Sequence, residues 1–318
     1  MEFLFAPLEG ITYPEYRQIH HRLFPGANQY YSPFIAPGGN GEFKPGFLER
    51  LHPDAALGIN LVPQIMANNP LAFIDTAMKL KALGYDEVNL NAGCPSGTVF
   101  AKHKGSGMLL DLKTLDSFLD TIFSKADISI SVKTRMGVES TDEFRAILDI
   151  YNKYPIKKLI IHARDRSGQY QSIPDIEGFA EAFSKSSNPV AYNGDIFSHE
   201  DLNKIIKLVP SLQSVMIGRG AAANPALIRI LQGGHSLQLK EFINFHDSLL
   251  GAYLSKMDER AAINRMKNLW YYMDCLFNAD PKYIKAINKS KKLSDYKSAV
   301  SALCNCDFNG SAAFTAKE

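Results

Sequence analysis

The residue most able to do covalent or proton-transfer chemistry is a cysteine in a glycine-rich turn. Cys94 lies in Asn89-Leu90-Asn91-Ala92-Gly93-Cys94-Pro95-Ser96-Gly97, where an apolar run gives way to a loop. No cysteine or histidine near it has the spacing of a metal site. A neutral thiol at this position could donate a proton as a general acid. The alternative is a small buried hydrophobe, which is the usual role of a lone cysteine.

Other polar residues follow short apolar runs in the same way, and most of these runs end with a group that could bind or react. In a barrel of parallel strands, all such ends and their loops form one face, where active sites lie. Any one residue could simply be a surface residue at the end of a strand. Their joint occurrence at corresponding positions indicates a site made of Glu9, Gln64, Asn91, Cys94, Lys133, Arg135, His162, Arg164, Asn193, Asp195 and Arg219.

The elements that would position these residues are short runs of strand type. Several are continuous apolar stretches, which is typical of strands covered on both faces in a parallel sheet. Helical-length amphipathic segments lie between most of them, the clearest over Asn69 to Gly84. Eight runs are expected to be strands, over residues 2–8, 29–35, 61–67, 87–93, 128–134, 158–164, 189–195 and 214–220.

Eight strand-helix units predict an α/β fold, a (β/α)8 TIM barrel. A doubly wound open sheet is the competing architecture. Its dinucleotide-binding form would need Gly-x-Gly-x-x-Gly in the first turn, and Pro7-Leu8-Glu9-Gly10 lacks that pattern. Residues 33–63 are rich in Gly and Pro and are expected to form a loop over the barrel mouth.

The loops after the last two predicted strands could bind phosphate. Asn193-Gly194-Asp195 follows the seventh, and Gly218-Arg219-Gly220 follows the eighth and leads into a helix. Barrels often bind phosphate there, because small residues allow the backbone to approach closely. Arg219 could add a charge-assisted hydrogen bond. The other possibility is that these glycines only turn the chain.

Lys133 suits the opposite end of a flavin. A cation near the N1 and C2 region stabilises a reduced flavin ring, Gln64 can bond to the ring edge, and backbone at Ala6 to Leu8 can lie beside it. An inward charge on a strand is costly unless it is paired. A ligand would therefore explain Lys133.

Composition excludes two classes of protein. The 318 residues are 46% hydrophobic and 21% charged, which is neither the composition of a disordered chain nor that of a membrane-spanning one. Four cysteines are too few for a disulfide framework, and the N-terminus has no secretory signal pattern, so a reducing cytoplasm is expected.

The charge balance and the pattern of predicted secondary structure both change near residue 239. Residues 240–318 hold 12 basic and 9 acidic residues, whereas the whole chain has a net charge of only +2. This segment contains only helical patterns, over 241–254, 260–277, 281–288 and 294–304. The predicted domains are a barrel over 1–238 and a helical domain over 239–306, with a disordered tail over 307–318. A basic patch of Lys282, Lys285, Lys289, Lys291, Lys292 and Lys297 could attract phosphates or could be only a solvated helix face.

Together these motifs resemble the flavin-dependent tRNA-dihydrouridine synthases over roughly residues 1–230. The resemblance lies in Ala6-Pro7-Leu8-Glu9-Gly10, in Asn91 to Ser96 with Gly105-Ser106-Gly107, in Val132 to Gly137, in His162-Ala163-Arg164 with Gln169 and Tyr170, and in the two glycine loops. The helical segment, with Ile263 to Leu269, resembles that family's RNA-binding domain more loosely.

The resemblance implies an FMN enzyme that reduces uridine in RNA to 5,6-dihydrouridine with NADPH, passing hydride from flavin N5 to uracil C6. It makes Cys94 the catalytic residue that protonates C5, and Asn91, Arg135 and Arg164 substrate ligands. It assigns FMN to Pro7, Leu8, Glu9, Gln64, Lys133, His162, Asn193, Gly194, Asp195, Gly218 and Arg219. The expected partner is tRNA, with ribosomal RNA as an alternative, and the expected state is a monomer.

Three departures from the family pattern concern RNA contacts more than the cofactor. Gly97 replaces a common lysine, Tyr13 replaces a common acidic residue, and Gln171 to Ile176 replace the usual ending of the motif after Tyr170. Two rival functions remain: an FMN barrel acting on a free pyrimidine, similar to dihydroorotate dehydrogenase, and a non-catalytic RNA-binding barrel.

Overall fold

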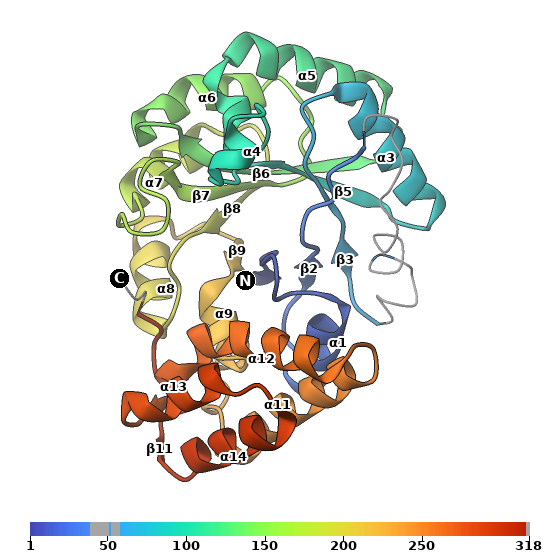
Figure 1. Ribbon diagram of the computed structural model, residues 1–318. Coiled ribbons are helices and arrows are strands. Elements are labelled where there is room, and N and C mark those ends of the chain that lie inside the picture. Colours follow the sequence, from blue (N-terminus) through green and yellow to red (C-terminus); the bar gives the residue numbers. More distant parts are fainter. Residues whose placement is uncertain (39–50, 52–57, 316–318) are drawn as a thin grey trace. The chain divides into compact units, whose positions relative to one another are not determined.

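In the computed structural model, residues 1–38, 51 and 58–315 are described (Figure 1). Most of the loop predicted over 33–63 therefore lies outside the described residues. The chain divides into two compact units. The first comprises Met1–Pro7, Asn28–Gly194 and Asn203–Met216, and the second comprises Leu8–Ala27, Asp195–Leu202 and Ile217–Glu318.

The first unit is built on a sheet of parallel strands. In the described residues nine strands form it, in the order β3-β2-β1-β9-β8-β7-β6-β5-β4. Their bounds are β1 (Glu2–Phe5), β2 (Gln29–Tyr31), β3 (Leu61–Val62), β4 (Gln64–Ile65), β5 (Glu87–Ala92), β6 (Ser129–Gly137), β7 (Leu159–Asp165), β8 (Val190–Asn193) and β9 (Ser214–Ile217). All eight predicted strands are confirmed, mostly with shorter ends.

The sheet closes on itself through the third predicted strand, which is divided at Pro63. Proline has no N–H to donate to a ladder, so β3 ends before it and β4 begins after it. The two halves pair with opposite ends of the sheet, β3 with β2 and β4 with β5. The prediction of a barrel is confirmed, and the open doubly wound sheet is excluded.

Helices cover the outer face of the strands in this unit (Figure 1). The longest start at clear signals: Asn69 accepts from the Ala72 N–H at the start of α3, and Asp111 accepts from the Lys113 and Thr114 N–H groups at the start of α5. Their bounds are α3 (Pro70–Ala82), α4 (Gly97–Phe100), α5 (Leu112–Lys125), α6 (Phe144–Tyr151) and α7 (Ile176–Lys185), and α8 (His199–Leu208) follows β8.

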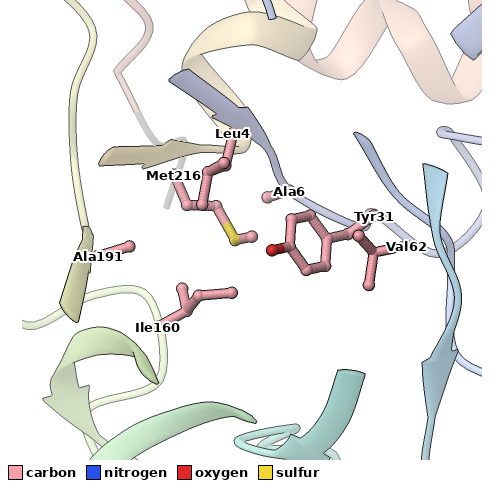
Figure 2. Close-up of a cluster of buried hydrophobic side chains, with 7 residues drawn as sticks. All are labelled: Leu4, Ala6, Tyr31, Val62, Ile160, Ala191 and Met216. Atoms are coloured by element: carbon pink, nitrogen blue, oxygen red, sulfur yellow. The ribbon is translucent and has the colours of Figure 1, made fainter. Parts of the chain in front are cut away.

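The barrel interior combines an apolar cluster with a polar ladder. The cluster in Figure 2 is contributed by β1, β2, β3, β7, β8 and β9 and by Ala6, just after β1; it consists of Leu4, Ala6, Tyr31, Val62, Ile160, Ala191 and Met216. The remaining strands contribute buried Gln64, Asn89 and Ser131 instead. Because every one of these polar side chains is hydrogen-bonded to another, the ladder can be buried without a large desolvation cost.

The second unit is mainly helical. Its elements are α1 (Pro14–Leu23), α9 (Arg219–Ala223), α10 (Leu227–Leu231), α11 (Leu239–Leu254), α12 (Glu259–Met273), α13 (Pro281–Lys289) and α14 (Leu293–Cys304), with a small antiparallel sheet of β10 (Phe277–Asn278) and β11 (Asp307–Phe308). The four helices predicted after residue 239 are confirmed. None of the helices in the described residues is long and apolar enough to cross a membrane.

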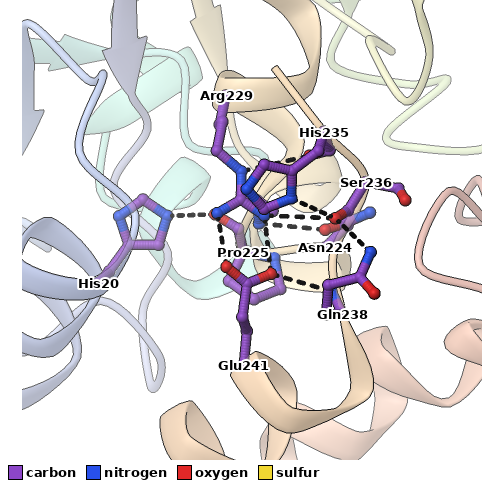
Figure 3. A network of polar contacts seen from close by, with 9 residues as sticks. His20, Asn224, Pro225, Arg229, His235, Ser236, Gln238 and Glu241 are labelled. Atoms are coloured by element: carbon purple, nitrogen blue, oxygen red, sulfur yellow. Dashed lines mark hydrogen bonds and ion pairs between the residues drawn. The ribbon is translucent and has the colours of Figure 1, made fainter.

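The helix α1 belongs to this second unit because aromatic side chains fix it there. Tyr16 and Phe24 both meet the Phe245 ring edge-on, at centroid distances of 5.5 and 5.6 Å. Buried His20 bonds to the Pro225 carbonyl oxygen at 2.9 Å, and burial lowers the pKa of His20 to about 3 (Figure 3). The predicted single boundary at residue 238 stays a prediction, since the two compact units have other bounds.

The network in Figure 3 also fixes the start of α11. Arg229 donates through both terminal nitrogens to the Glu241 carboxylate, at 2.8 and 2.9 Å, and Glu241 accepts from the Gln238 N–H. This bidentate pair lowers the pKa of Glu241. It joins α10 to α11 across the loop between them.

The prediction of a disordered tail is wrong for residues 307–315. Phe308 pairs with Phe277 in the small antiparallel sheet, and the Gly310 carbonyl oxygen accepts from Asn224 Nδ2 at 2.8 Å. Phe314 is 3% exposed and its ring packs against Phe197 and Tyr272, each at 5.6 Å. The buried ring of Phe314 therefore holds this segment in place, although the composition of the segment predicted disorder.

A buried hydrogen-bonded chain gives a testable stability effect in the helical unit. Trp270 Nε1 donates to Tyr296 Oη at 2.9 Å, and Tyr296 Oη lies 2.8 Å from His246 Nε2. Tyr296→Phe would leave two buried nitrogens without this oxygen and is expected to lower the free energy of unfolding by about 2 kcal/mol. Urea denaturation measures the change. Tyr283→Phe is the matched control on a half-buried tyrosine; an equal loss in both variants would contradict the role of the chain.

Candidate active site

The carboxyl ends of four neighbouring strands bring the predicted residues into register. Asn91 on β5 is paired with Lys133 on β6. Arg135 is paired with His162 on β7, and His162 with Asn193 on β8. In a parallel sheet paired residues lie side by side, so Asn91 and Lys133 lie at one level, and Arg135, His162 and Asn193 lie at a second level two residues further along β6. Together the two levels form one polar row across the four strands.

An amide network starts this row. Asn91 Nδ2 donates to Gln64 Oε1 at 2.7 Å, and Gln64 Nε2 donates to Asn89 Oδ1 at 2.8 Å. Both Gln64 and Asn91 are buried. The network fixes which end of each amide faces its neighbour, so these side chains present set donors and acceptors.

Asn91 also shapes the cysteine loop. Its Oδ1 accepts from the Gly93 N–H at 3.1 Å and from the Cys94 N–H at 3.0 Å. Asn91 was expected to bind substrate. The structure shows that its oxygen already holds the turn that carries Cys94.

The Cys94 backbone is held from a second side by Gly105 and Ser106. Buried Ser106 donates from its hydroxyl to the Cys94 carbonyl oxygen at 2.8 Å, and its N–H donates to the same oxygen at 3.1 Å. Gly105 has a φ of 57°, and a Cβ there would lie 2.8 Å from Cys94 Cβ. Only glycine fits this close approach without strain. Cys94 itself is half-buried and is a free thiol.

Lys133 lies in the middle of β6 and has no hydrogen bond or ion pair to any other described residue, although its side chain is half-buried. Burial, together with the nearby Arg135 guanidinium, lowers the pKa of Lys133 to about 7, while a thiolate at Cys94 would raise it. Lys133 and Cys94 therefore lie within electrostatic range of each other. A half-buried lysine with no partner among the described residues favours a ligand with an acceptor or a negative charge at this position.

Arg135 was expected to bind substrate. In the structure its guanidinium donates hydrogen bonds to backbone carbonyl oxygens instead. Its Nε donates to the Gly93 carbonyl oxygen at 3.1 Å, and its Nη1 donates to the carbonyl oxygens of Asp165 and Gln169 at 2.5 and 2.8 Å. Arg135 is 1% exposed. It therefore connects the cysteine loop to the loop after β7.

His162 and Arg164 complete the row on β7. Arg164 Nη1 lies 3.2 Å from His162 Nε2, and Arg164 Nε donates to the Ser172 carbonyl oxygen at 2.6 Å. The Tyr170 ring lies 5.9 Å from the His162 ring. His162 and Arg164 are both buried. Arg164 therefore holds the loop after β7 in place, in addition to any contact that it makes with substrate.

Asn193 and Gly194 close the row at β8. Asn193 Nδ2 donates to the Met216 carbonyl oxygen at 2.8 Å. A Cβ on Gly194 would lie 2.1 Å from Tyr192 Oη. Glycine is therefore required at Gly194 by packing, in addition to any role in binding a phosphate.

Of the remaining predicted residues, half-buried Pro7 ends a segment of the first unit, and Leu8, Glu9, Asp195, Gly218 and Arg219 belong to the second unit. Leu8 is half-buried, and its N–H donates to Thr12 Oγ1 at 2.8 Å. Tyr13 donates to Glu9 Oε1 at 2.5 Å, and the Arg265 guanidinium lies 4.2 Å over the Tyr13 ring. This arrangement gives the substitution at Tyr13 a role, because the ring takes up the cation of Arg265.

The two predicted phosphate loops touch each other within this unit. Arg219 Nη2 pairs with Asp195 Oδ1 at 2.5 Å, and both side chains are half-buried. A Cβ on Gly220 would lie 2.3 Å from the Ile196 carbonyl oxygen. Glycine at Gly220 therefore allows the loops that follow Asp195 and Gly218 to meet.

Some contributors were not predicted as site residues. Asn89 belongs to the amide network, Gly105 and Ser106 hold the cysteine turn, and the Arg166 guanidinium lies 4.1 Å over the Phe100 ring. The only sequence signal for Gly105 and Ser106 was their place in the resemblance. Residues so far apart in the chain give no local pattern, and only folding brings them together.

The family model for dihydrouridine synthase matches residues 4–307. Similar curated proteins include tRNA-dihydrouridine synthase B of Pseudomonas aeruginosa, 26% identical over 71% of this chain and 67% of that protein. The Pasteurella multocida tRNA-dihydrouridine synthase B is 27% identical over 77% of this chain and 72% of that protein. A probable tRNA-dihydrouridine synthase of Staphylococcus aureus is 26% identical over 84% and 81%.

Among solved structures the chain is similar to flavoenzyme barrels. Old yellow enzyme from Trypanosoma cruzi has a TM-score of 0.54 at 11% identity, covering 74% of this chain and 89% of that chain. Morphinone reductase in complex with tetrahydroNAD has a TM-score of 0.53 at 12% identity, covering 74% and 88%. These likenesses show the fold. With the match of the family model over nearly its whole length, the chain belongs to the dihydrouridine synthase family and is a flavin-dependent enzyme.

Proposed function

We propose that this protein reduces uridine in tRNA to 5,6-dihydrouridine, with FMN as its flavin and NADPH as its electron donor. The observation that carries the proposal is the pair of Cys94 and Lys133, a free thiol beside a cation without a partner among the described residues, at the end of a barrel of this family. The names of the similar proteins support tRNA as the substrate.

The residues at the barrel end fit a flavin. Lys133 would face an electron-rich ring edge, Gln64 would offer its amide, and His162 and Asn193 lie in register beside them. Gly194, which packing against Tyr192 already requires to be glycine, is proposed to offer its backbone to the phosphate group. We assign FMN to these five residues and, by the resemblance, also to Pro7, Leu8, Glu9, Asp195, Gly218 and Arg219.

When bound, the reduced flavin supplies the hydride that saturates C6 of uracil. The chain itself must then deliver a proton to C5. Cys94 can do so because the turn that carries its thiol is fixed: the Cys94 N–H donates to Asn91, and Ser106 and Arg135 donate to the carbonyl oxygens of Cys94 and Gly93. Arg164 is proposed to contact uracil or an RNA phosphate, and Asn91 and Arg135 to act on the substrate through the loops that they hold.

The helical segment 239–306 is proposed to bind the RNA backbone. Lys282, Lys285 and Lys289 lie on α13 at helical spacing, and all three are exposed. Attraction of this kind for phosphates depends on salt, because binding releases counterions.

Replacing Lys282, Lys285 and Lys289 together with alanine is expected to weaken tRNA binding and to reduce the slope of log affinity against log salt by about 2 to 3. Filter binding at several salt concentrations measures both quantities. A triple change of exposed Lys113, Lys125 and Lys207 is the control of equal charge. If both triple variants have the same slope as the unchanged protein, the patch is only a solvated face.

The proposed function is tested by incubating the FMN-loaded protein with NADPH and unmodified tRNA, and separately with free uracil and with orotate. Mass spectrometry of the digested RNA is expected to show dihydrouridine. Turnover of a free base alone would overturn the RNA substrate. The same assay with ribosomal RNA in place of tRNA tests the choice of tRNA as substrate. Light scattering measures the mass of the protein in solution and tests the proposed monomer. Action in the cytoplasm belongs to the same proposal.

A further inference from the structure

The loop after β7 combines an unusually exposed apolar side chain with an unusually well-held backbone. Ile173 is 88% exposed, the highest value among the large hydrophobic residues of the described chain. Single exposed apolar residues are common and need no function by themselves. What distinguishes Ile173 is how firmly the chain on both sides of it is held.

Two buried arginines and a strand hold this loop. Arg164 donates to the carbonyl oxygen of Ser172, the residue directly before Ile173, at 2.6 Å. Arg135 donates to the Asp165 and Gln169 carbonyl oxygens. After Ile173, the Asp175 N–H donates to the Ala163 carbonyl oxygen on β7 at 2.7 Å. Ile173 is therefore presented by a fixed backbone, so its exposure is not a consequence of a loose loop.

The middle of the loop is also held in an unfavourable conformation. Gln169 has a φ of 47°, in the left-handed region that residues other than glycine rarely adopt. The next residue, Tyr170, lies under the Arg135 guanidinium at 5.2 Å and against His162. Strain of this kind persists only where the surroundings determine the backbone, and it is concentrated at functional sites.

The loop lies against the loop that carries Cys94. Arg166 stacks on Phe100 of α4 at 4.1 Å, and Arg135 bonds to Gly93 on one side and to Gln169 on the other. Lys102, Lys104 and Arg166 on these two loops add positive charge, and Lys102 is exposed. An apolar side chain with cations around it suits nucleic acid, where a base meets the apolar group and phosphates meet the cations.

We infer that Ile173 is an apolar wedge that contacts a nucleobase next to the target uridine and keeps the stack open while that uridine occupies the site. An enzyme that acts on a base must take it out of the stack, and apolar side chains inserted between base steps partly unstack those steps. Ile173 is a positioning residue, since it acts on the substrate's neighbouring base and not on the reacting atoms. The inference rests on the proposed function, because it assumes an RNA substrate.

The test is a set of variants at Ile173 in the full-length, FMN-loaded protein, assayed on unmodified tRNA. Ile173→Ala and Ile173→Gln are expected to lower kcat/KM for dihydrouridine formation by about tenfold or more, because unstacking a base is costly. Ile173→Leu is expected to retain most of the activity, since it keeps the apolar volume. Flavin reduction by NADPH should be unchanged in all three variants.

Two controls separate a wedge from other roles. Leu71→Ala changes an apolar side chain that is 62% exposed on α3 and is expected to have no effect. Lys102→Ala should reduce the salt slope of tRNA binding, whereas Ile173→Ala should leave that slope unchanged.

The inference is overturned if the alanine and glutamine variants stay within about twofold of the unchanged protein, well below the cost of unstacking a base. It is also overturned if the leucine variant loses as much as the glutamine variant. If the unchanged protein binds FMN and forms no dihydrouridine from any RNA, the proposed function fails and the wedge fails with it. If the unchanged protein forms dihydrouridine, the results with the Ile173 variants test the wedge alone and leave the proposed function standing.

Discussion

Cys94→Ala is expected to lower the rate of dihydrouridine formation by about a hundredfold to ten-thousandfold, the usual contribution of a general acid. Flavin binding and oxidation of NADPH should be retained, because the cysteine is assigned to the proton and not to the hydride. Stopped-flow absorbance of the flavin and mass spectrometry of the RNA measure the two halves separately. The turn itself should persist, since its hydrogen bonds come from the backbone of Cys94 and not from its thiol.

A matched substitution is Cys306→Ala, which also removes a half-buried free thiol, in the second unit. It should leave both half-reactions unchanged. Cys94→Ser keeps a group that can hold a proton but is a weaker acid, so a partial loss is expected. Dihydrouridine formation at the normal rate by Cys94→Ala would exclude Cys94 as the proton donor and would return it to the role of a packed side chain.

Binding of FMN at about pH 8.5 is expected to take up close to one proton, and Lys133 is the source of this effect. In the flavin-free protein, burial and the Arg135 charge lower the pKa of Lys133 to about 7, so the side chain is mostly neutral at that pH. A ligand that accepts a hydrogen bond from the ammonium raises the pKa again. Calorimetry in two buffers with different ionisation enthalpies measures the proton uptake.

Lys133→Met should abolish this uptake and weaken flavin binding by about tenfold to a hundredfold, the effect of losing a hydrogen bond from a charged group. Lys157→Met is a suitable control, because that lysine is more exposed and pairs with Glu87. Proton uptake of the same size in Lys133→Met would assign the titration to another group and remove the strongest support for a ligand at Lys133.

The same shift fixes the sign of a stability effect. Because the pKa of Lys133 is lower in the folded protein than in the unfolded chain, the unfolded chain binds more protons between about pH 7 and 10.5. The contribution of Lys133 to stability in the flavin-free protein therefore rises with pH across this range. Bound flavin should remove that dependence.

Local patterns were sufficient for most of the barrel. Runs such as Leu159 to Ile161 are apolar without interruption, and a strand covered on both faces requires this pattern. Asn69 and Asp111 mark helix starts by chemistry that acts within three residues. The division of one strand at Pro63 also has a local cause, the missing N–H of proline, and could have been predicted from the sequence.

The tail is where composition misled. Residues 307–315 are small and polar apart from Phe308 and Phe314, and a short segment of this kind has no regular period that would predict a helix or a strand. Phe314 is buried because Phe197 and Tyr272, distant in the chain, provide the surface on which it packs. No local property of the segment contains that information.

The sequence by itself determined the barrel, the strands that carry or precede Cys94, Lys133 and His162, and the family, because each depends on residue types and short spacings. Only the tertiary structure decided what each side chain touches. It showed that Arg135 bonds to three carbonyl oxygens, that Lys133 has no partner among the described residues, and that a held loop exposes Ile173. Hydrogen bonds and burial depend on atoms that are far apart in the chain, and the closed sheet is what brings them within reach.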